Sequence, residues 1–484
     1  MECLKGLQPE KVFYFFEEMC KIPHGSGNTK QISDYLVGFA MERNLEHYQD
    51  ESGNVVMIQE ATEGYEDQPA VILQGHMDMV AVHKPELTID MTKEPLKPVI
   101  DGDFVYAEGT SLGGDDGIAV AYALAILDSK EIKHPRLEVV ITVDEEIGLL
   151  GAASVDLSKL KGQRLLNIDS EEEGIFLTSC AGGVCVTCHV ETQQEEKEGV
   201  AYEVVIGGLQ GGHSGTEIGK ERSSANMLTG RLLYQLTSQE GISLYDAQGG
   251  LADNAICRET ILHFLVAENS CDAFEQALRN WRQSVCKELQ SKESGLFVEV
   301  RRGSKEQKQC ITGTELKKIA AFLYALPGGV QAMSVDVPGL VETSLNMGIL
   351  RMTAAETDCA FSVRSSIETA KEALVARLEA ITTLAGGKIE TTGDYPGWAY
   401  RVQSPLREKM ITLYETMFGE KPQVQAIHAG LECGILASKI KDMDAVSFGP
   451  NILDIHTTEE RLSISSTQRV WEFLIALLET KDEA

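Results

Sequence analysis

Short apolar runs alternate with amphipathic stretches along the first 190 residues of this 484-residue chain. Between Pro9 and Arg43, apolar residues three and four positions apart predict helices, interrupted by a turn-rich stretch at 23–28. Runs of valine, isoleucine and leucine predict buried strands, and a longer apolar stretch predicts a helix: the strands are 54–58, 71–73, 137–143 and 165–168, and the helix is 118–127. Because strands that alternate with helices are typical of α/β folds, we predict an α/β domain with a mixed, largely parallel sheet flanked by helices.

The pattern changes after about residue 190. Two successive rounds of predicted helices and antiparallel strands follow, at 202–300 and 316–385, and indicate α+β structure built from two similar units. His456, a candidate ligand described below, comes after this stretch. We therefore predict that 1–190 and 395–484 form one catalytic domain and that 191–394 is an inserted lid domain, able to open and close over a cleft.

The charge of the chain limits its partners. With 43 basic and 74 acidic residues the formal net charge is −31, so we expect no binding to nucleic acid or to anionic membranes. The segment 1–6 lacks the apolar core of a signal peptide, and no run is long enough to span a membrane. We expect a cytoplasmic protein with reduced cysteines. Cys185 and Cys188 lie three apart in a strand-like run, which puts their sulfurs on opposite faces and argues against a redox or metal role.

Side chains that can bind a metal ion follow the predicted strands. His76 and Asp78 come just after the strand at 71–73, and because they are two apart they emerge on the same side. The other candidates are Asp115 in a glycine-rich turn before a helix, Glu145 and Glu146 after the strand that ends at 143, Asp169 after the strand that ends at 168, and the late His456. Because α/β sheets assemble their sites at the carboxyl ends of strands, we expect these residues to meet there.

Two histidines and three carboxylates favour a site for two divalent ions. Imidazole ligands favour zinc, although manganese or cobalt can occupy the same kind of site. Five ligands are too many for one tetrahedral zinc ion, but they suit two ions about 3.5–4 Å apart that share a carboxylate. Asp115, at a helix start, is the candidate bridge. Glu145 is the candidate base that takes a proton from the attacking water, and Asp78 is expected to orient His76 through its other ring nitrogen.

Each of these features also has a purely structural interpretation. A His-x-Asp pair is usually structural, and neighbouring aspartates at a helix start can simply offset the helix dipole. The acidic residues after 143 and 168 could belong to solvated loops. We retain the structural interpretation for Asp116 and a loop role for His24. The common position of the candidates, at strand ends and a glycine-rich turn, favours the metal site.

Taken together, the motifs resemble the dinuclear zinc aminopeptidase/aminoacylase clan, and within it the aminoacyl-histidine dipeptidase (Xaa-His dipeptidase) branch. The resemblance covers nearly the whole chain in order. It is carried by Gly75-His-Met-Asp78, Leu112-Gly-Gly-Asp115-Asp-Gly117, Val143-Asp-Glu-Glu-Ile-Gly148, Asp169-Ser-Glu171, Gly211-Gly-His-Ser-Gly215, Tyr395-Pro-Gly-Trp398, His428-Ala-Gly-Leu-Glu432-Cys-Gly434 and His456.

The resemblance implies roles for individual residues. One zinc ion would be held by His76, Asp115 and Asp169, and the other by Asp115, Glu146 and His456. The catalytic pair would be Asp78 and Glu145. In the lid, His213 would donate a hydrogen bond to the developing oxyanion, and Arg364 would bind the substrate carboxylate. Arg258 is a competing candidate for that last role. Relatives of this architecture commonly pair through the lid, which implies a homodimer.

The sequence thus predicts a cytoplasmic metallopeptidase with two divalent metal ions that hydrolyses small peptides, above all Xaa-His dipeptides such as β-alanyl-histidine. A broad-specificity dipeptidase, a tripeptidase and an N-acyl amino acid hydrolase of the same clan are the alternatives, because specificity depends on lid contacts. A catalytically silent relative that only binds metal or peptide would lack a ligand or the general base. This chain lacks none of them.

Overall fold

A computed structural model describes residues 3–482 and divides the chain into two compact units. The first unit comprises the chain up to Ser179, Tyr400–Ala426, and the chain from Leu431 on. The second comprises Cys180–Ala399 and Ile427–Gly430. The functions predicted for these two parts, catalytic domain and lid, remain predictions.

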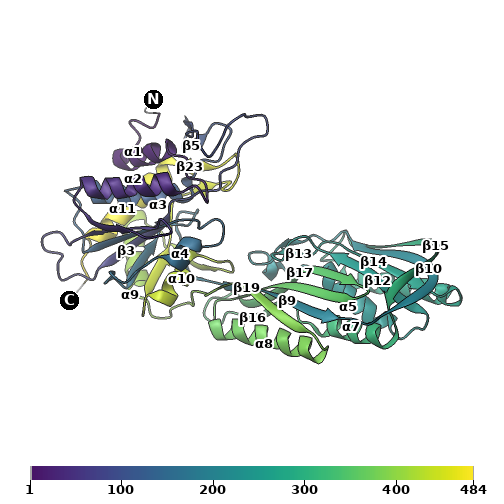
Figure 1. The fold of residues 1–484 in the computed structure, drawn as a ribbon. Helices are drawn as coiled ribbons and strands as arrows, with labels where there is room; N and C mark the ends of the chain where they lie inside the picture. Colours follow the sequence, from purple (N-terminus) through teal and green to yellow (C-terminus); the bar gives the residue numbers. More distant parts are fainter. Residues whose placement is uncertain (1–2, 483–484) are drawn as a thin grey trace. The chain divides into compact units, whose positions relative to one another are not determined.

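The first unit is built on an eight-stranded mixed sheet with helices packed against it (Figure 1). In spatial order the strands are β1 (Glu46–Gln49), β2 (Val55–Gln59), β6 (Leu137–Thr142), β3 (Val71–His76), β7 (Arg164–Asn167), β21 (Asp444–Ser447), β8 (Ile175–Cys180) and β20 (Gln423–Ile427). The helices are α1 (Glu10–Cys20), α2 (Lys30–Glu42), α3 (Gly114–Asp128), α4 (Leu150–Ser154), α9 (Pro405–Phe418), α10 (Glu432–Lys439) and α11 (Ile464–Glu479). The central strands β6, β3, β7 and β21 are parallel, which confirms the predicted fold class.

The core of this unit surrounds α3, whose residues from Gly117 to Leu127 are all buried. A helix that is apolar all round must be covered on every side, and α3 packs on both α1 and β3. A second part of the core is a cluster of aromatic rings from four segments, made by Phe176, Tyr414, Phe448 and Phe473.

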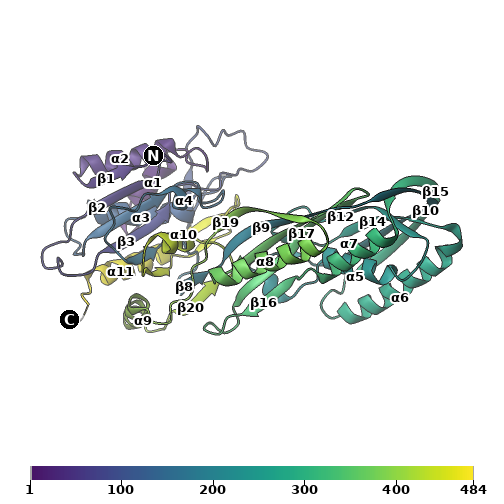
Figure 2. The same ribbon diagram turned by 60° about the horizontal axis from the view of Figure 1, so that its bottom comes forward.

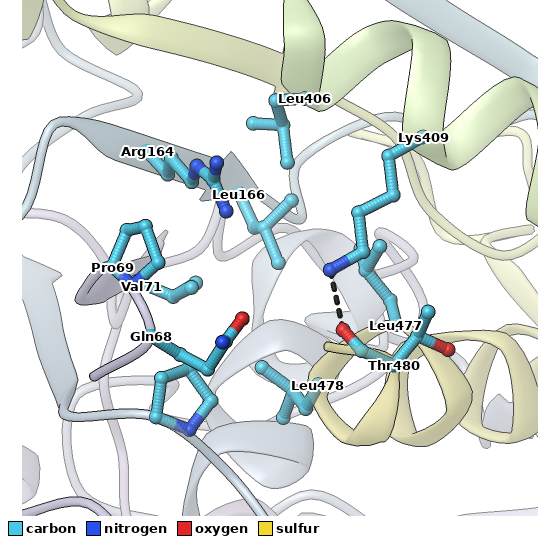
Figure 3. Close-up of a pocket in the computed structure, with 11 residues that line it drawn as sticks. Gln68, Pro69, Val71, Arg164, Leu166, Leu406, Lys409, Leu477, Leu478 and Thr480 are labelled. Atoms are coloured by element: carbon cyan, nitrogen blue, oxygen red, sulfur yellow. Dashed lines mark hydrogen bonds between the residues drawn. The ribbon is translucent and has the colours of Figure 1, made fainter. Parts of the chain in front are cut away.

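An apolar pocket at the amino ends of β3 and β7 is lined by Val71, Leu166 and Leu477 (Figure 3). At its side, Lys409 donates a hydrogen bond to the Thr480 carbonyl. The pocket contains none of the predicted site residues.

A small sheet in the same unit carries the last predicted ligand. Its strands, in spatial order, are β22 (Ile452–Leu453), β23 (Arg461–Ser463), β5 (Phe104–Ala107) and β4 (Pro98–Asp101). His456 lies in the loop that joins β22 to β23, two antiparallel strands.

The second unit is a nine-stranded sheet with helices along one side (Figure 2). Its strands are β14 (Thr260–Val266), β10 (Gln194–Gly207), β15 (Phe297–Ile311), β12 (Ile242–Gly249), β17 (Val341–Thr353), β18 (Glu356–Ser365), β9 (Gly182–Glu191) and β19 (Lys388–Tyr395), with β16 (Gly329–Met333) paired to β17. The helices are α5 (Ala225–Leu236), α6 (Cys271–Leu289), α7 (Gly313–Ala325) and α8 (Glu368–Leu384). A two-stranded ribbon joins β11 (Gly212–His213) to β13 (Ala255–Ile256). Every pairing in the large sheet is antiparallel.

Alternation along β9 agrees with the argument made for its cysteines. Cys188 is buried with Val184, Val186 and Val190, whereas Cys185 belongs to the intervening, half-buried set. The two sulfurs therefore lie on opposite faces of the sheet, as the spacing predicted. Among the described residues, no helix is long and apolar enough to cross a membrane.

The aromatic cluster allows a stability prediction for the first unit. Phe473 on α11 is 1% exposed and contacts the rings of Phe176, Tyr414 and Phe448. Phe473→Ala should lower the free energy of unfolding by about 3–5 kcal/mol, because it leaves a cavity between four segments. Urea unfolding followed by circular dichroism measures this loss.

The matched control is Glu472→Ala, on the same helix but exposed. It should change the free energy of unfolding by about 0.5 kcal/mol or less. Equal losses for the two variants would show that the aromatic cluster is not a main source of stability.

Candidate metal centre

The carboxyl ends of three parallel strands bring the predicted ligands together. His76 ends β3 and lies directly opposite Thr142, the last residue of β6. β7 flanks β3 on its other side, with Asn167 opposite Gln74. The loops that carry Glu145, Glu146 and Asp169 therefore begin beside His76. All five predicted metal ligands lie in the first unit.

Asp115 occupies the centre of the cluster. Its Oδ1 is 3.3 Å from His76 Nε2, and its Oδ2 is 3.2 Å from His456 Nε2. Because the two oxygens of one carboxylate face two different imidazoles, Asp115 has the geometry of a bridging ligand. The two histidines come from segments about 380 residues apart in the sequence, counted from 76 to 456.

One further carboxylate contacts each histidine. Asp169 Oδ1 is 3.5 Å from His76 Nε2, and Glu146 Oε1 is 2.9 Å from His456 Nε2. The contacts thus form two groups, His76–Asp115–Asp169 and Asp115–Glu146–His456, which are the two sets that the family resemblance implies. In the second group, all three residues present ligand atoms within 4.8 Å of one another. The assignment of these residues as metal ligands stays a prediction.

The Asp78 carboxylate contacts several segments beside the cluster. Its Oδ1 accepts the Glu145 backbone N–H at 3.0 Å and lies 3.4 Å from His76 Nδ1. Its Oδ2 accepts the Glu146 backbone N–H at 3.4 Å and the Ser26 hydroxyl at 2.8 Å. His76 Nδ1 lies 3.0 Å from the Asp78 carbonyl oxygen, an acceptor only, so Nδ1 carries a proton and Nε2 is the nitrogen that faces Asp115 and Asp169. Asp78 therefore orients both the histidine and the loop that holds Glu145.

Asp116 also lies beside His76, whose backbone N–H it accepts at 3.2 Å through Oδ2. With Asp169 it forms another group of potential ligand atoms around His76. Gly75 makes this approach feasible, because a Cβ there would lie 2.4 Å from Asp116 Oδ2. Asp116 is 1% exposed and burial raises the pKa of its carboxyl well above the usual value. The contact with a backbone N–H agrees with the structural role retained for this residue.

The acidic surroundings change the protonation of both histidines. Hydrogen bonds with Asp115 and Glu146 raise the pKa of His456 to about 10. Burial opposes a charge on His76, but hydrogen bonds with Asp115, Asp169 and Asp78 outweigh it and raise the His76 pKa well above its usual value. Burial likewise acts against ionised Asp115, yet hydrogen bonds with the two histidines keep its pKa below the ordinary range. In the absence of another cation, protons neutralise this cluster.

Two further carboxyls of the cluster, Glu145 and Asp169, have raised pKa values. Burial raises the pKa of Glu145 to about 9, and it raises the pKa of Asp169 to about 6 although His76 acts in the opposite direction. A carboxyl in that condition becomes a base only when positive charge is brought beside it. The position of Glu145 thus makes its ionisation depend on cations in the cluster.

The donor set fits divalent metal ions. Within the part of the chain that the structure describes, no lysine or arginine forms an ion pair with any carboxylate of the cluster, namely Asp78, Asp115, Asp116, Glu145, Glu146 and Asp169. Imidazole nitrogens and carboxylate oxygens suit zinc, manganese or cobalt, and bound ions would supply the missing positive charge.

The predicted substrate-binding residues lie in the second unit. His213, on β11, accepts hydrogen bonds at Nδ1 from the backbone N–H groups of Gly215 at 3.3 Å and Thr216 at 3.2 Å. An Nδ1 that accepts leaves the proton on Nε2. Burial and the nearby Arg364 lower the pKa of His213, which keeps the ring neutral. His213 therefore presents one N–H donor, as the predicted oxyanion contact requires.

Arg364 and Arg258 have different environments. Arg364 is 8% exposed, donates to the Tyr395 hydroxyl at 2.9 Å, and has a buried Nε with no hydrogen-bond partner. Arg258 is exposed, and its Nε donates to the Leu209 carbonyl at 3.2 Å. A buried guanidinium with an unused donor is the better receptor for a carboxylate, which favours Arg364.

Some residues that contact the predicted site residues of each unit had no clear signal in the sequence. Ser26, which donates to Asp78, lies in the turn-rich interruption between the first helices, where it reads as an ordinary loop residue. Tyr395 and His428 were noted only within the family-like motifs. In the structure Tyr395 bonds Arg364, and His428 Nε2 lies 2.7 Å from the Ser344 hydroxyl, so both belong to the surroundings of Arg364. These contacts join residues far apart in the sequence and form only in the folded chain.

Comparisons with known proteins agree with this geometry. The model of peptidase family M20/M25/M40 matches residues 72–480. Over 480 residues the chain is 35% identical to the cytosol non-specific dipeptidase of Escherichia coli (strain K12), covering 99% of both chains. It is also 35% identical to the crystal structure of aminoacylhistidine dipeptidase from Vibrio alginolyticus, with a TM-score of 0.94 and coverage of 99% of this chain and 98% of that one.

A more distant structure shares the fold alone. The aminopeptidase PepT from Bacillus cereus ATCC 10987 is 17% identical, with a TM-score of 0.56 and coverage of 98% of each chain. The family match extends over most of the chain and includes every predicted metal ligand from His76 to His456. The chain therefore belongs to peptidase family M20/M25/M40 and is a hydrolase of peptide bonds.

Proposed function

We propose that this protein is a dipeptidase that uses two divalent metal ions, with zinc as the favoured metal and Xaa-His dipeptides such as β-alanyl-histidine as preferred substrates. The observation that carries the proposal is Asp115, whose two oxygens face two histidines, each with a further carboxylate. The names of the Escherichia coli and Vibrio alginolyticus relatives support a dipeptidase.

The ligand sets follow the two groups of contacts. His76, Asp115 and Asp169 would hold one ion, and Asp115, Glu146 and His456 the other. Bound there, the ions would lower the pKa of water and polarise the peptide carbonyl. Positive charge would also ionise the carboxyl of Glu145, whose pKa is otherwise raised by burial.

The chain's own residues would move the protons. Glu145 first acts as a general base and takes a proton from the attacking water. It then acts as a general acid and gives that proton to the leaving amine. Asp78 holds the Glu145 backbone N–H and keeps His76 Nδ1 protonated, so that His76 Nε2 remains a ligand. Neutral His213 would donate its Nε2–H to the oxyanion, and Arg364 would bind the substrate carboxylate.

A broad-specificity dipeptidase is the second candidate, because the Escherichia coli relative is named a non-specific dipeptidase. The two candidates share the metal centre and differ only in how the substrate side chains are held. The term cytosol in the name of the same relative supports a cytoplasmic location. A homodimer formed through the second unit remains an expectation from the family resemblance.

The specificity prediction concerns histidine-containing dipeptides. Protein stripped of metal with a chelator should be inactive, and zinc or manganese should restore release of histidine from β-alanyl-histidine and Ala-His. Ala-Ala, a tripeptide and an N-acetyl amino acid, assayed beside them, should be cleaved at least about tenfold more slowly, the difference that one good polar contact makes. Equal cleavage of Ala-Ala would establish the broad-specificity alternative, and preference for the last two substrates would contradict a dipeptidase.

The general-base prediction concerns Glu145→Gln. The amide cannot accept a proton, so kcat should fall by about 10²–10⁴-fold while both metal ions remain bound, as measured by metal analysis after dialysis. Glu172→Gln is the matched control, because Glu172 is an exposed residue of the loop that follows β7. Near-normal kcat in Glu145→Gln with both metals present would rule Glu145 out as the base.

The pH prediction follows from the raised pKa values of His456, to about 10, and His76. At neutral pH both rings and the Glu145 carboxyl are protonated in the metal-free protein. The ligands must lose their protons and the ions would ionise Glu145, so metal binding should release roughly three protons, two of them from the histidines. Metal affinity should consequently fall as pH falls. Calorimetric titration with zinc in buffers of different ionisation enthalpy measures the number of protons from the slope of the observed heat.

His456→Ala should reduce this number by about one, because it removes one of the two protonated rings. His83→Ala, at an exposed histidine outside the cluster, should leave it unchanged. A slope of zero in the unmodified protein would mean that the histidines do not bind the metal.

A further inference from the structure

Glu460 is a buried carboxylate to which none of the proposed steps gives a role. It is 3% exposed and lies four residues after His456, in the loop between β22 and β23. No lysine or arginine forms an ion pair with it among the residues that the structure describes. A buried carboxylate without a cationic partner needs several hydrogen bonds to be stable, and the structure shows where they come from.

Four consecutive backbone N–H groups donate to this one carboxylate. Oε2 accepts from Leu112 at 2.8 Å and from Gly113 at 3.1 Å. Oε1 accepts from Gly114 at 2.8 Å and from Asp115 at 3.3 Å. Gly113 has a φ of +72°, a conformation that L side chains rarely adopt, and this turn helps the successive N–H groups converge on one point.

The segment that Glu460 binds is the turn that leads into α3, because the backbone of Asp115 and Asp116 is non-helical and the regular helix follows them. Successive N–H groups in a turn of this kind form a concave site that favours an anion. In many proteins a ligand supplies that anion. Here a side chain of the protein supplies it, and both of its oxygens are used by N–H groups. Glu460 is thus excluded as a substrate contact, because it has neither exposure nor a free oxygen with which to bind one.

The bonds from Glu460 connect two parts of the metal centre. Asp115, whose N–H is the fourth donor, faces His456 through Oδ2 at 3.2 Å. His456 is carried by the same short loop as Glu460. The turn with Asp115 and the loop with His456 are about 340 residues apart in the sequence, counted from 115 to 456, and Glu460 is a direct link between them.

We propose that Glu460 is a positioning residue, which fixes Asp115 relative to His456 and so raises the affinity for the metal ion held by Asp115, Glu146 and His456. The inference rests on the proposed metal-dependent function and adds to it a residue outside the ligand set. Replacing a residue that hydrogen-bonds to a metal ligand and orients it typically lowers the metal affinity by about 10–100-fold.

The test is Glu460→Gln with cobalt(II) as the probe. Glutamine keeps one acceptor oxygen, but its NH₂ group can only donate, so two of the four backbone N–H groups lose their acceptor. Cobalt is titrated into metal-stripped full-length protein against a competing chelator, and the visible absorption of each equivalent is recorded. Glu459→Gln is the matched control, since Glu459 is an exposed neighbour that pairs with Lys84.

The expected result is that one of the two cobalt equivalents binds about 10–100-fold more weakly in Glu460→Gln, with an altered absorption band, while the other equivalent is unchanged. Glu459→Gln should match the unmodified protein in both. A Glu460→Gln protein that binds two equivalents with unchanged affinity and spectrum would overturn the inference, even if its melting temperature falls. That result would assign Glu460 to fold stability alone.

Glu460→Asp covers the case in which Glu460→Gln does not fold. It keeps the carboxylate and moves it back by one methylene, and a partial loss of affinity for the same equivalent is expected. Unchanged cobalt binding in folded Glu460→Asp would likewise overturn the positioning role. Failure of the unmodified protein to bind two equivalents is a different outcome, because it would contradict the proposed function from which this inference starts.

Discussion

The carboxylate of Asp78 receives hydrogen bonds from segments that would otherwise be independent. It accepts the backbone N–H groups of Glu145 and Glu146 and the hydroxyl of Ser26, and it lies against His76. Since Asp78 follows directly on β3, these bonds fix the loop after β6 and the turn before α2 to the end of one buried strand. A buried carboxylate with this many donors keeps its pKa low and its position constant, although burial alone would act the other way.

The cluster above Asp78 is electrostatically unfavourable on its own. Several carboxyls lie within a few ångströms of one another with no lysine or arginine paired to them among the described residues, in a chain whose formal net charge is already −31. Burial raises the pKa of Glu145 and of Asp169, and the neighbouring acids act in the same direction. Hydrogen bonds with those acids raise the pKa of the two histidines. A site of this kind has its greatest affinity for compact multivalent cations, and it sacrifices some stability of the metal-free fold for that affinity.

In this site backbone N–H groups stabilise buried carboxylates that have no lysine or arginine partner among the described residues. Glu460 accepts hydrogen bonds from four N–H groups in the segment 112–115, and Asp116 accepts the N–H of His76. Backbone hydrogen bonds of this kind allow acids to be buried without a cationic partner. The glycines at 75 and 113 are part of the same arrangement, because one makes room for a carboxylate and the other turns the backbone toward one.

The residue types and the local pattern of the sequence were sufficient to identify the candidate metal ligands. Apolar runs located β3, β6 and β7, and polar residues at their carboxyl ends marked His76, Glu145, Glu146 and Asp169, because a parallel sheet brings those ends to one edge. The α/β class and the helices on either side of 23–28 followed from periodicity in the same way. The last helix, α11, was not predicted. β15 and β17 include polar residues that no apolar run marks as strand, because sheet pairing holds them in place.

Only the tertiary structure decided how those residues act together. No spacing in the sequence indicates that the two oxygens of Asp115 face His76 and His456, that Ser26 bonds Asp78, or that Glu460 binds the turn that leads into α3. Nor does it distinguish Arg364 from Arg258, which differ chiefly in burial. The reason is physical: residue type and periodicity act over a few neighbours, whereas these contacts join segments tens to hundreds of residues apart, and their geometry exists only after the sheets have paired.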